Sequence, residues 1–463
     1  MTVELIGIFI YIVAQFAIGA LLFRKQASED DYFLAGRNVG FAMATFSIFA
    51  TWFGAETCVG SAGEVFNSGL SGARIDPFGY TICLLLMGLL LVMRIYKHRI
   101  TTLADLYRER YGKVVEQTAA IIMIPTSLFW AAAQIRAFGQ IISASSELTV
   151  VAGMTAAAVV VTAYTVIGGL RADIVTDLVQ GILLILGLAL LAVVTVVHLG
   201  GISQAVALID RERMSLLTPD DSLWAQIDTW MIPILGSLVS QELVARIVSS
   251  RTITIARRAT LAATAMYLLL GSLPLLIGLL GPHLVEAGID HEQFLATIAR
   301  LHLPGILYIV FAGAVVSAIL STVDSALLAS GALASHNILG PLFRLKEERM
   351  KTVLARVSVL GSGVIAFVMA ISSEGIRDLV ETASSFGSAG LLVVTLFGLF
   401  TGYGGRVAAL AALVGGVGGL LLAENVLMLD APYLFSVGSA VALYLTIGLF
   451  ERKYQRPALP DLN

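Results

Sequence analysis

The sequence predicts an all-α protein that crosses a membrane many times, and two observations support this fold class. Hydrophobic residues make up 57% of the 463 positions and charged residues only 13%, with a mean hydropathy of +0.89. Soluble domains carry about 25% charged residues, and a chain this apolar would expose a hydrocarbon surface in water. About thirteen segments also reach the ~20 apolar residues that one helical crossing needs. Soluble enzymes, nucleic-acid-binding proteins and disordered scaffolds are therefore excluded.

The expected spans follow one another with short polar connections, so residues 1–463 are expected to form a single membrane domain. The first span runs uncharged from Leu5 to Phe23, which is too long for a signal-peptide core, and we interpret it as a retained helix. Boundaries are expected near 4–24, 42–67, 76–96, 115–146, 148–168, 173–199, 225–249, 257–283, 302–338, 352–372, 377–400, 405–424 and 431–451.

The basic residues predict the orientation of these spans. Of the 29 Lys and Arg residues, 23 lie in alternate connections that would share one side of the membrane. Cytoplasmic connections are enriched in Lys and Arg, so we expect the N-terminus outside and the C-terminus in the cytoplasm of a plasma or inner membrane. The net charge of −3 implies no nucleic-acid partner, and the two cysteines, Cys58 and Cys83, indicate no disulfide framework.

Two spans contain glycine and a carboxylate at membrane depth. The second span includes Gly54 and Glu56, and the seventh includes Gly236 and Glu242. These spans are five apart, and transporters built from two five-helix inverted repeats have a broken helix at the start of each repeat. We therefore expect repeats at 42–199 and 225–400, with one extra helix before them and two after them at 405–451. The alternative is a weak point tolerated in an ordinary packed helix.

The ninth span carries small and hydroxyl side chains on one face, because Ala318, Ser321, Thr322 and Ser325 are spaced by three and four residues. Two adjacent hydroxyls facing the carbonyl groups of a broken helix would form an oxygen-only site suited to Na⁺. Close helix packing is the alternative interpretation. Asp324 favours a site, since a charge inside a span usually faces a partner or a cavity.

These motifs resemble those of the sodium:solute symporter family, which has a LeuT-type core of five plus five inverted-repeat helices. The resemblance covers nearly the whole chain. It is carried by Phe33-Leu34-Ala35-Gly36-Arg37, Gly168-Gly169-Leu170, Thr176-Asp177 with Gln180, and the Ala-x-x-Ser-Thr motif that ends at Thr322.

The resemblance implies where sodium would bind. One Na⁺ would be held by the backbone carbonyls of Ala50, Phe53 and Ala318 and by the hydroxyls of Ser321 and Thr322. Some members bind a second Na⁺, and the matching positions are Asp177, Asp324 and Ser325. The sequence does not decide whether this second site is present, because such members often have serine at the position of Asp324. Asp177 has the alternative interpretation of a helix-start residue near the interface.

The aromatic residues of this chain resemble those at the matching positions in the branch of the family that contains the high-affinity choline transporters. Trp52, Tyr80 and Trp130 are candidate faces of a cage for a cationic head group, with packing as the alternative. This branch has tryptophan at Ser240 and glycine at Glu56, and the carboxylate would suit a primary or secondary amine. Weaker candidates for solute contact are Gln134, Gln241 and Phe386, while Glu242 has the alternative of pairing with Arg246.

The function expected from these features is Na⁺-coupled import of a small polar organic solute, with a lean towards amines and amino acids. Sodium is the expected coupling ion, the bilayer and the solute are the expected partners, and the protein is expected to work as a monomer. A proton-coupled carrier and a transporter-like ligand sensor are the alternatives. An enzyme is not expected, since the sequence has no nucleophile–base pair and no metal-ligand spacing.

Overall fold

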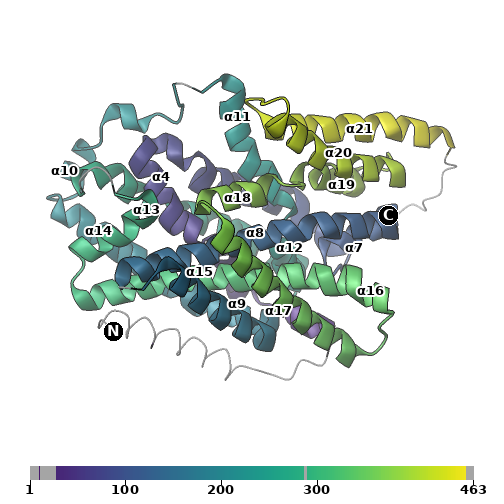
Figure 1. Cartoon of the computed structure of the whole chain (residues 1–463), viewed down its shortest axis with the longest axis horizontal. Coiled ribbons are helices and arrows are strands. Elements are labelled where there is room, and N and C mark those ends of the chain that lie inside the picture. Colours follow the sequence, from purple (N-terminus) through teal and green to yellow (C-terminus); the bar gives the residue numbers. More distant parts are fainter. Residues whose placement is uncertain (1–9, 11–27, 147, 220, 286–288, 455–463) are drawn as a thin grey trace.

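The computed structural model describes residues 10, 28–146, 148–219, 221–285 and 289–454 (Figure 1). Helix accounts for 86% of the structure, and the described residues contain no β-strand. The expected first span, 4–24, lies almost entirely outside the described residues.

The first part of the chain runs from the N-terminal side to a long helix that ends at residue 198. Its elements are α2 (Glu29–Leu34), η1 (Ala35–Arg37), α3 (Phe41–Trp52), η2 (Glu56–Gly60), α4 (Ser61–Ser68), η3 (Gly69–Ala73), η4 (Arg74–Gly79), α5 (Tyr80–Leu86), η5 (Met87–Leu91), α6 (Val92–Lys97), α7 (Leu103–Tyr111), α8 (Lys113–Ser145) and α9 (Val150–His198).

The second part begins with a polar connection and ends with two long helices that lie side by side (Figure 1). Its elements are α10 (Ile202–Ala207), η6 (Arg211–Met214), α11 (Leu223–Met231), η7 (Ile232–Gly236), η8 (Ser237–Val239), α12 (Gln241–Ser249), α13 (Ile253–Leu280), η9 (Gly281–His283), η10 (His291–Gln293), α14 (Phe294–His302), α15 (Gly305–Ala332), η11 (Leu333–Leu339), α16 (Gly340–Phe343), α17 (Glu348–Ser372), α18 (Ile376–Ser385), α19 (Ser388–Phe400), α20 (Arg406–Asn425) and α21 (Pro432–Tyr454).

Nine described helices are long and apolar enough to cross a membrane, or ten if the bent pair Leu223–Val239 and Gln241–Ser249 forms one span. Three of the nine are much longer than one crossing requires, Gly305–Phe343 with 39 residues, Glu56–Lys97 with 42 and Val150–His198 with 49. The longest of them has an internal break. Gly169 interrupts it with φ 59° and ψ −171°, where the sequence predicts the connection between two spans. The count of thirteen spans therefore stays a prediction.

Both segments that the sequence predicts as interrupted are interrupted in the structure. α3 stops at Trp52, and the seventh expected span bends by 46° at Ser240. A third interruption was not predicted. The expected span 377–400 is divided into α18 and α19 at Phe386 and Gly387, where the left-handed backbone of Gly387 (φ 70°) ends the first helix.

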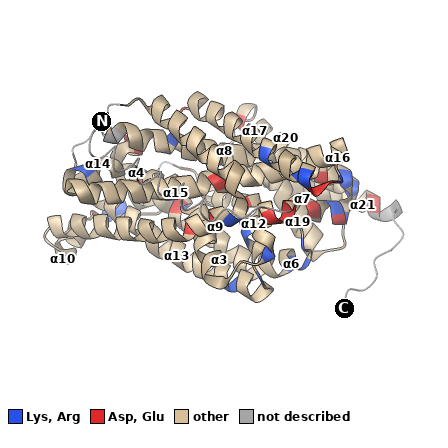
Figure 2. Cartoon of the chain, turned by 90° about the horizontal axis from the view of Figure 1, so that it is seen from below, with Lys and Arg blue, Asp and Glu red and all other residues tan. Residues whose placement is uncertain are grey.

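Charged side chains are concentrated at one end of the molecule. Lys and Arg residues gather at the end that carries α6, α7 and α16, while the opposite end, with α10, has fewer (Figure 2). The largest fully buried side chains are mostly aromatic, but Arg246 is among them. A buried guanidinium needs an anionic partner, so Arg246 indicates that the interior of the protein contains buried carboxylates.

Candidate functional site

The interruption of α3 is held open by contacts with two other helices. Phe53, a predicted sodium ligand, has the non-helical angles φ −87° and ψ 66°. The backbone N–H of Ala55 donates to Oε1 of Gln134 on α8 at 2.7 Å. A Cβ atom at Gly54 would lie 2.6 Å from that oxygen and 2.8 Å from Oγ1 of Thr322, so only glycine fits. The last carbonyl groups of α3 are thereby left without helical partners.

Thr322 on α15 lies directly against this interruption. Its hydroxyl donates to the carbonyl of Ala318 at 3.0 Å and lies 3.3 Å from the carbonyl oxygen of Ala50. The hydroxyl of Ser321 points to α9 and donates to the carboxylate of Asp177. Carbonyl and hydroxyl oxygens from α3 and α15 are thus brought together, which is how unwound transporter helices hold Na⁺.

Asp177 is fully buried about two turns beyond the break in α9. Besides Ser321, it accepts a hydrogen bond from the hydroxyl of Ser47 at 2.6 Å. Asp324 accepts from the hydroxyl of Tyr164 at 2.7 Å and from the backbone N–H of Ser325 at 2.9 Å. The three predicted residues of the second ion site therefore belong to one buried network, in which each already has protein partners.

Arg246 joins this network from α12 and was not predicted to do so. It donates to the carboxylate of Asp173 and to the hydroxyl of Ser325. Among the described ion pairs, Arg246 is paired with Asp173 and not with Glu242, the alternative suggested by the sequence. The spacing of Asp173 and Asp177, one helical turn apart on α9, was the signal that could have identified Asp173.

The three aromatic residues that the sequence singles out lie together. The ring centroids of Trp52 and Tyr80 are 5.4 Å apart, those of Trp52 and Trp130 6.3 Å, and those of Tyr80 and Trp130 5.9 Å. The Tyr80 ring stands edge-on to both tryptophans, the geometry that aromatic pairs favour. These residues come from α3, α5 and α8, and we refer to them as the aromatic trio.

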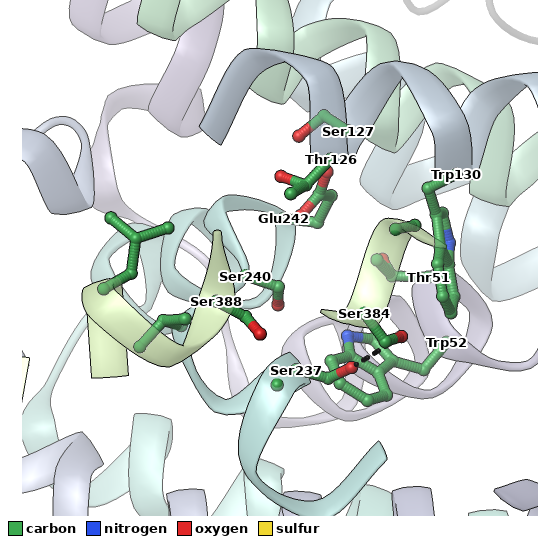
Figure 3. Close-up of a pocket in the computed structure, with 14 residues that line it drawn as sticks. Thr51, Trp52, Thr126, Ser127, Trp130, Ser237, Ser240, Glu242, Ser384 and Ser388 are labelled. Carbon is green, nitrogen blue, oxygen red and sulfur yellow. Dashed lines mark hydrogen bonds between the residues drawn. The ribbon is translucent and has the colours of Figure 1, made fainter. Parts of the chain in front are cut away.

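A cavity of about 40 Å³ borders the aromatic trio and is termed the serine cavity (Figure 3). Thr51, Trp52 and Trp130 form one side of it, and Glu242 lies among its other lining residues. Oγ of Ser240 and Oε1 of Glu242 are buried without a hydrogen-bond partner. The other serines that line it are Ser127, Ser237, Ser384 and Ser388, and Ser237 donates to Ser384 at 3.3 Å.

A second cavity, of about 50 Å³, is termed the acidic cavity because five carboxylates line it. Arg377 is the one Lys or Arg among the described residues of its wall, and it is ion-paired with both Glu64 and Glu381. Glu56, the predicted partner of a solute amine, lies here and not in the serine cavity. The other two carboxylates are those of Asp76 and Glu292.

Besides Glu56 and Tyr80, three more of the predicted solute contacts do not line the serine cavity. Gln134 supports the interruption of α3, as described above. Gln241 accepts from the backbone N–H of Leu103 at 2.7 Å and so ties α12 to the start of α7. Phe386 lies half-buried at the interruption between α18 and α19.

Known proteins resemble this chain over most of its length. A family model described as "Sodium:solute symporter family" matches residues 32–419. The high-affinity choline transporter 1 of Caenorhabditis elegans is 27% identical over 76% of this chain and 64% of its own length. The osmoregulated proline transporter OpuE of Bacillus subtilis is also 27% identical, over 84% of this chain and 82% of its own length. The chain thus spans less than two thirds of the choline relative.

Solved structures show the same fold. A Na⁺-coupled sialic acid symporter in a substrate-bound, outward-open state superposes with a TM-score of 0.86 at 17% identity and covers 97% of this chain and 98% of its own. The nucleobase-cation-symport-1 family transporter Mhp1 in a closed conformation superposes with a TM-score of 0.63 at 15% identity, over 94% and 96% of the two chains. The predicted LeuT-type fold class is confirmed, and the chain is a multi-pass membrane protein of a transporter class. With a family model that covers most of its residues, this chain belongs to the sodium:solute symporter family.

Proposed function

We propose that the protein is a sodium-coupled symporter that imports a small organic solute with a positively charged nitrogen by alternating access. One observation carries the proposal. The interruption of α3 contributes the carbonyl of Ala50 to the candidate ion site, and the next two residues, Thr51 and Trp52, line the serine cavity. Ion and solute would therefore both contact adjacent residues of the same short segment.

This arrangement would couple the binding of Na⁺ to the binding of solute. A sodium ion between α3 and α15 would fix the backbone from Ala50 to Phe53, and with it the wall of the serine cavity. Solute would then bind more tightly when Na⁺ is bound, and by reciprocity Na⁺ would bind more tightly with solute. Entry of the ion is also driven electrically, by about 2.3 kcal/mol per charge for each 100 mV.

The relatives support a solute that has a positively charged nitrogen. Choline and proline both contain a positively charged nitrogen, and proteins named for their transport resemble this chain. The serine cavity has aromatic faces at Trp52 and Trp130 and a carboxylate at Glu242, which together favour a cation. None of its described lining residues is a Lys or an Arg.

The remaining structural expectations belong to the same proposal. The two repeats occupy 42–199 and 225–400, and the helices at 405–451 lie outside them. The N-terminus faces the outside, the C-terminus faces the cytoplasm of a plasma or inner membrane, and a single chain suffices for transport. The concentration of Lys and Arg at the end with α7 and α16 supports this orientation (Figure 2).

Transport into proteoliposomes tests the coupling ion. With choline and proline as probes, uptake should require an inward Na⁺ gradient, and Ser321→Ala with Thr322→Ala should abolish the Na⁺ dependence because two ligands are lost. Thr118→Ala, which removes an exposed hydroxyl on α8, is the control and should behave as the unaltered chain. Uptake that is equally fast in K⁺ would contradict the proposal.

A proton-coupled carrier of the same fold is the second candidate, favoured by the buried carboxylate oxygen Oε2 of Glu56, which lacks a hydrogen-bond partner. A proton gradient in Na⁺-free buffer would then drive uptake by itself. The same vesicles distinguish the two candidates, because the Ser321 and Thr322 substitutions should leave proton-driven uptake in place.

A further inference from the structure

Two carboxylates of the acidic cavity each keep one oxygen without a partner. Glu56 and Asp76 are 8% and 3% exposed, and both line the cavity. Oε2 of Glu56 and Oδ1 of Asp76 are buried and accept no hydrogen bond. Burying an unpaired carboxylate oxygen is costly, so the cavity is built to receive a group that can donate to both.

The protein itself provides only neutral donors to these two groups. Oδ2 of Asp76 accepts from the hydroxyls of Thr57 at 2.6 Å and Tyr267 at 2.8 Å. No ion pair joins either carboxylate to a Lys or Arg in the described part of the chain, and Arg377 is already committed to Glu64 and Glu381. A cationic ligand would supply the positive charge that the protein does not.

Tyr80 connects the acidic cavity with the serine cavity. Its hydroxyl lies 3.0 Å from that of Ser384, which lines the serine cavity, and Tyr80 follows Asp76 of the acidic cavity by four residues in the chain. Its ring belongs to the aromatic trio. The aromatic trio therefore links the walls of the two cavities, and aromatic faces attract cations.

We propose that the acidic cavity is a first binding station for the ammonium group of the solute, with Glu56 and Asp76 as its two acceptors, before the solute reaches the serine cavity. This inference rests on the proposed function and narrows its solute to a cation whose nitrogen carries N–H bonds. A primary or secondary ammonium has at least two N–H bonds, one for each of these oxygens. A quaternary ammonium has no N–H, and it would leave both oxygens unsatisfied.

A metal ion fits the same residues less well. Among the described residues, no group of three or more His, Cys, Asp or Glu side chains converges in the way that a metal site needs. Two acceptor oxygens beside the Tyr80 ring match an ammonium, which combines directed N–H donors with a charge that an aromatic face can attract.

A methylation series tests this inference. Ethanolamine, its N-methyl and N,N-dimethyl derivatives, and choline carry three, two, one and no N–H bonds on the charged nitrogen. Binding to the purified full chain in saturating Na⁺ is followed by tryptophan fluorescence, because Trp52 and Trp130 lie beside Tyr80. We expect the dissociation constant to rise at least tenfold from ethanolamine to choline. Equal affinities, or no binding of any of the four amines, would overturn the inference.

The variants Asp76→Asn and Glu56→Gln should each abolish this ranking, so that the four amines bind within about twofold of one another. Glu64→Gln is the matched control. It removes one negative charge from the same cavity, but Glu64 already has Arg377 as a partner, so the ranking should persist. A ranking that survives in both test variants, or disappears in the control, contradicts the inference.

Two further measurements show whether a negative result comes from a misfolded variant, from an error in the symport proposal or from an error in this inference. The melting temperature of each variant in Na⁺ reports its fold, and Glu56→Gln keeps the experiment decisive if Asp76→Asn does not fold. Na⁺ dependence of binding is measured on the same samples. If the four amines show the expected ranking but Na⁺ has no effect on their binding, the symport proposal is wrong and the inference about the acidic cavity stands. If Na⁺ strengthens binding but the four amines bind equally, only the inference about the acidic cavity is wrong.

Discussion

Gly54 is the residue on which the candidate ion site depends most directly, because its missing side chain lets α3, α8 and α15 meet. A methyl group there would press against Gln134 and Thr322 at 2.6 and 2.8 Å. Overpacking of this kind costs about 1–3 kcal/mol. We therefore expect Gly54→Ala to raise the Na⁺ concentration for half-maximal uptake about tenfold, which corresponds to about 1.4 kcal/mol.

The control for this prediction is Gly361→Ala on α17, where an added Cβ would meet nothing within 4 Å. Alanine favours helix more than glycine does, so this variant should fold at least as well and keep the normal Na⁺ dependence. Finding the same Na⁺ dependence in both variants would show that the fit at Gly54 does not govern ion binding.

Single residues were predicted with uneven success, for a physical reason. The aromatic trio was singled out by residue type, and the structure brings its three rings together. Gln134 and Gln241 were named as weaker candidates for solute contact, but each accepts a hydrogen bond from a backbone N–H far away in the sequence. A single sequence shows that a buried amide needs a partner, not whether that partner is a solute or the backbone.

At the scale of elements, interruptions were predictable where glycine occurs together with polar residues. The breaks in α3 and before α12 coincide with such segments. The break between α18 and α19 was missed, although Ser384, Ser385 and Gly387 form a similar pattern there. The segment has no carboxylate at its centre, and glycine alone is common in ordinary membrane helices.

The ion pair between Arg246 and Asp173 joins α12 to α9, and both side chains are at most 2% exposed. Removing one partner from a buried pair leaves an uncompensated charge and costs about 3–5 kcal/mol. We therefore expect Arg246→Met and Asp173→Asn each to lower the melting temperature in Na⁺-free detergent solution. The double variant should melt above both single variants, since it leaves no unpaired member of this pair.

Lys351→Met is the comparison for this ion pair. Lys351 is paired with Glu348 at 2.7 Å, but the two side chains are 32% and 50% exposed, and such pairs contribute only about 0–1 kcal/mol. Its melting temperature should stay close to that of the unaltered chain. A double variant less stable than either single variant would mean that α9 and α12 are held together by other contacts.

For the whole molecule, composition was sufficient to predict an all-α membrane protein, and the motif resemblance to predict its LeuT-type fold. The number of spans was harder to predict, because a polar kink and a true connection look alike in sequence. Gly169 interrupts a helix of 49 residues without a loop. Its backbone has a left-handed φ, and a Cβ there would lie 2.7 Å from the carbonyl oxygen of Tyr32, so the break packs closely against α2.

The orientation in the membrane can be tested on the whole chain, because its only two cysteines, Cys58 and Cys83, are both buried. The unaltered protein should therefore give no signal with a membrane-impermeant maleimide. Arg211 in η6 and Lys346 after α16 are exposed, and α10 and α16 lie at opposite ends of the molecule (Figure 1). Arg211→Cys should be labelled in intact cells and Lys346→Cys only after permeabilisation, since the Lys- and Arg-rich end is expected to face the cytoplasm. The reverse pattern would invert the topology and, with it, the side from which a solute enters the acidic cavity.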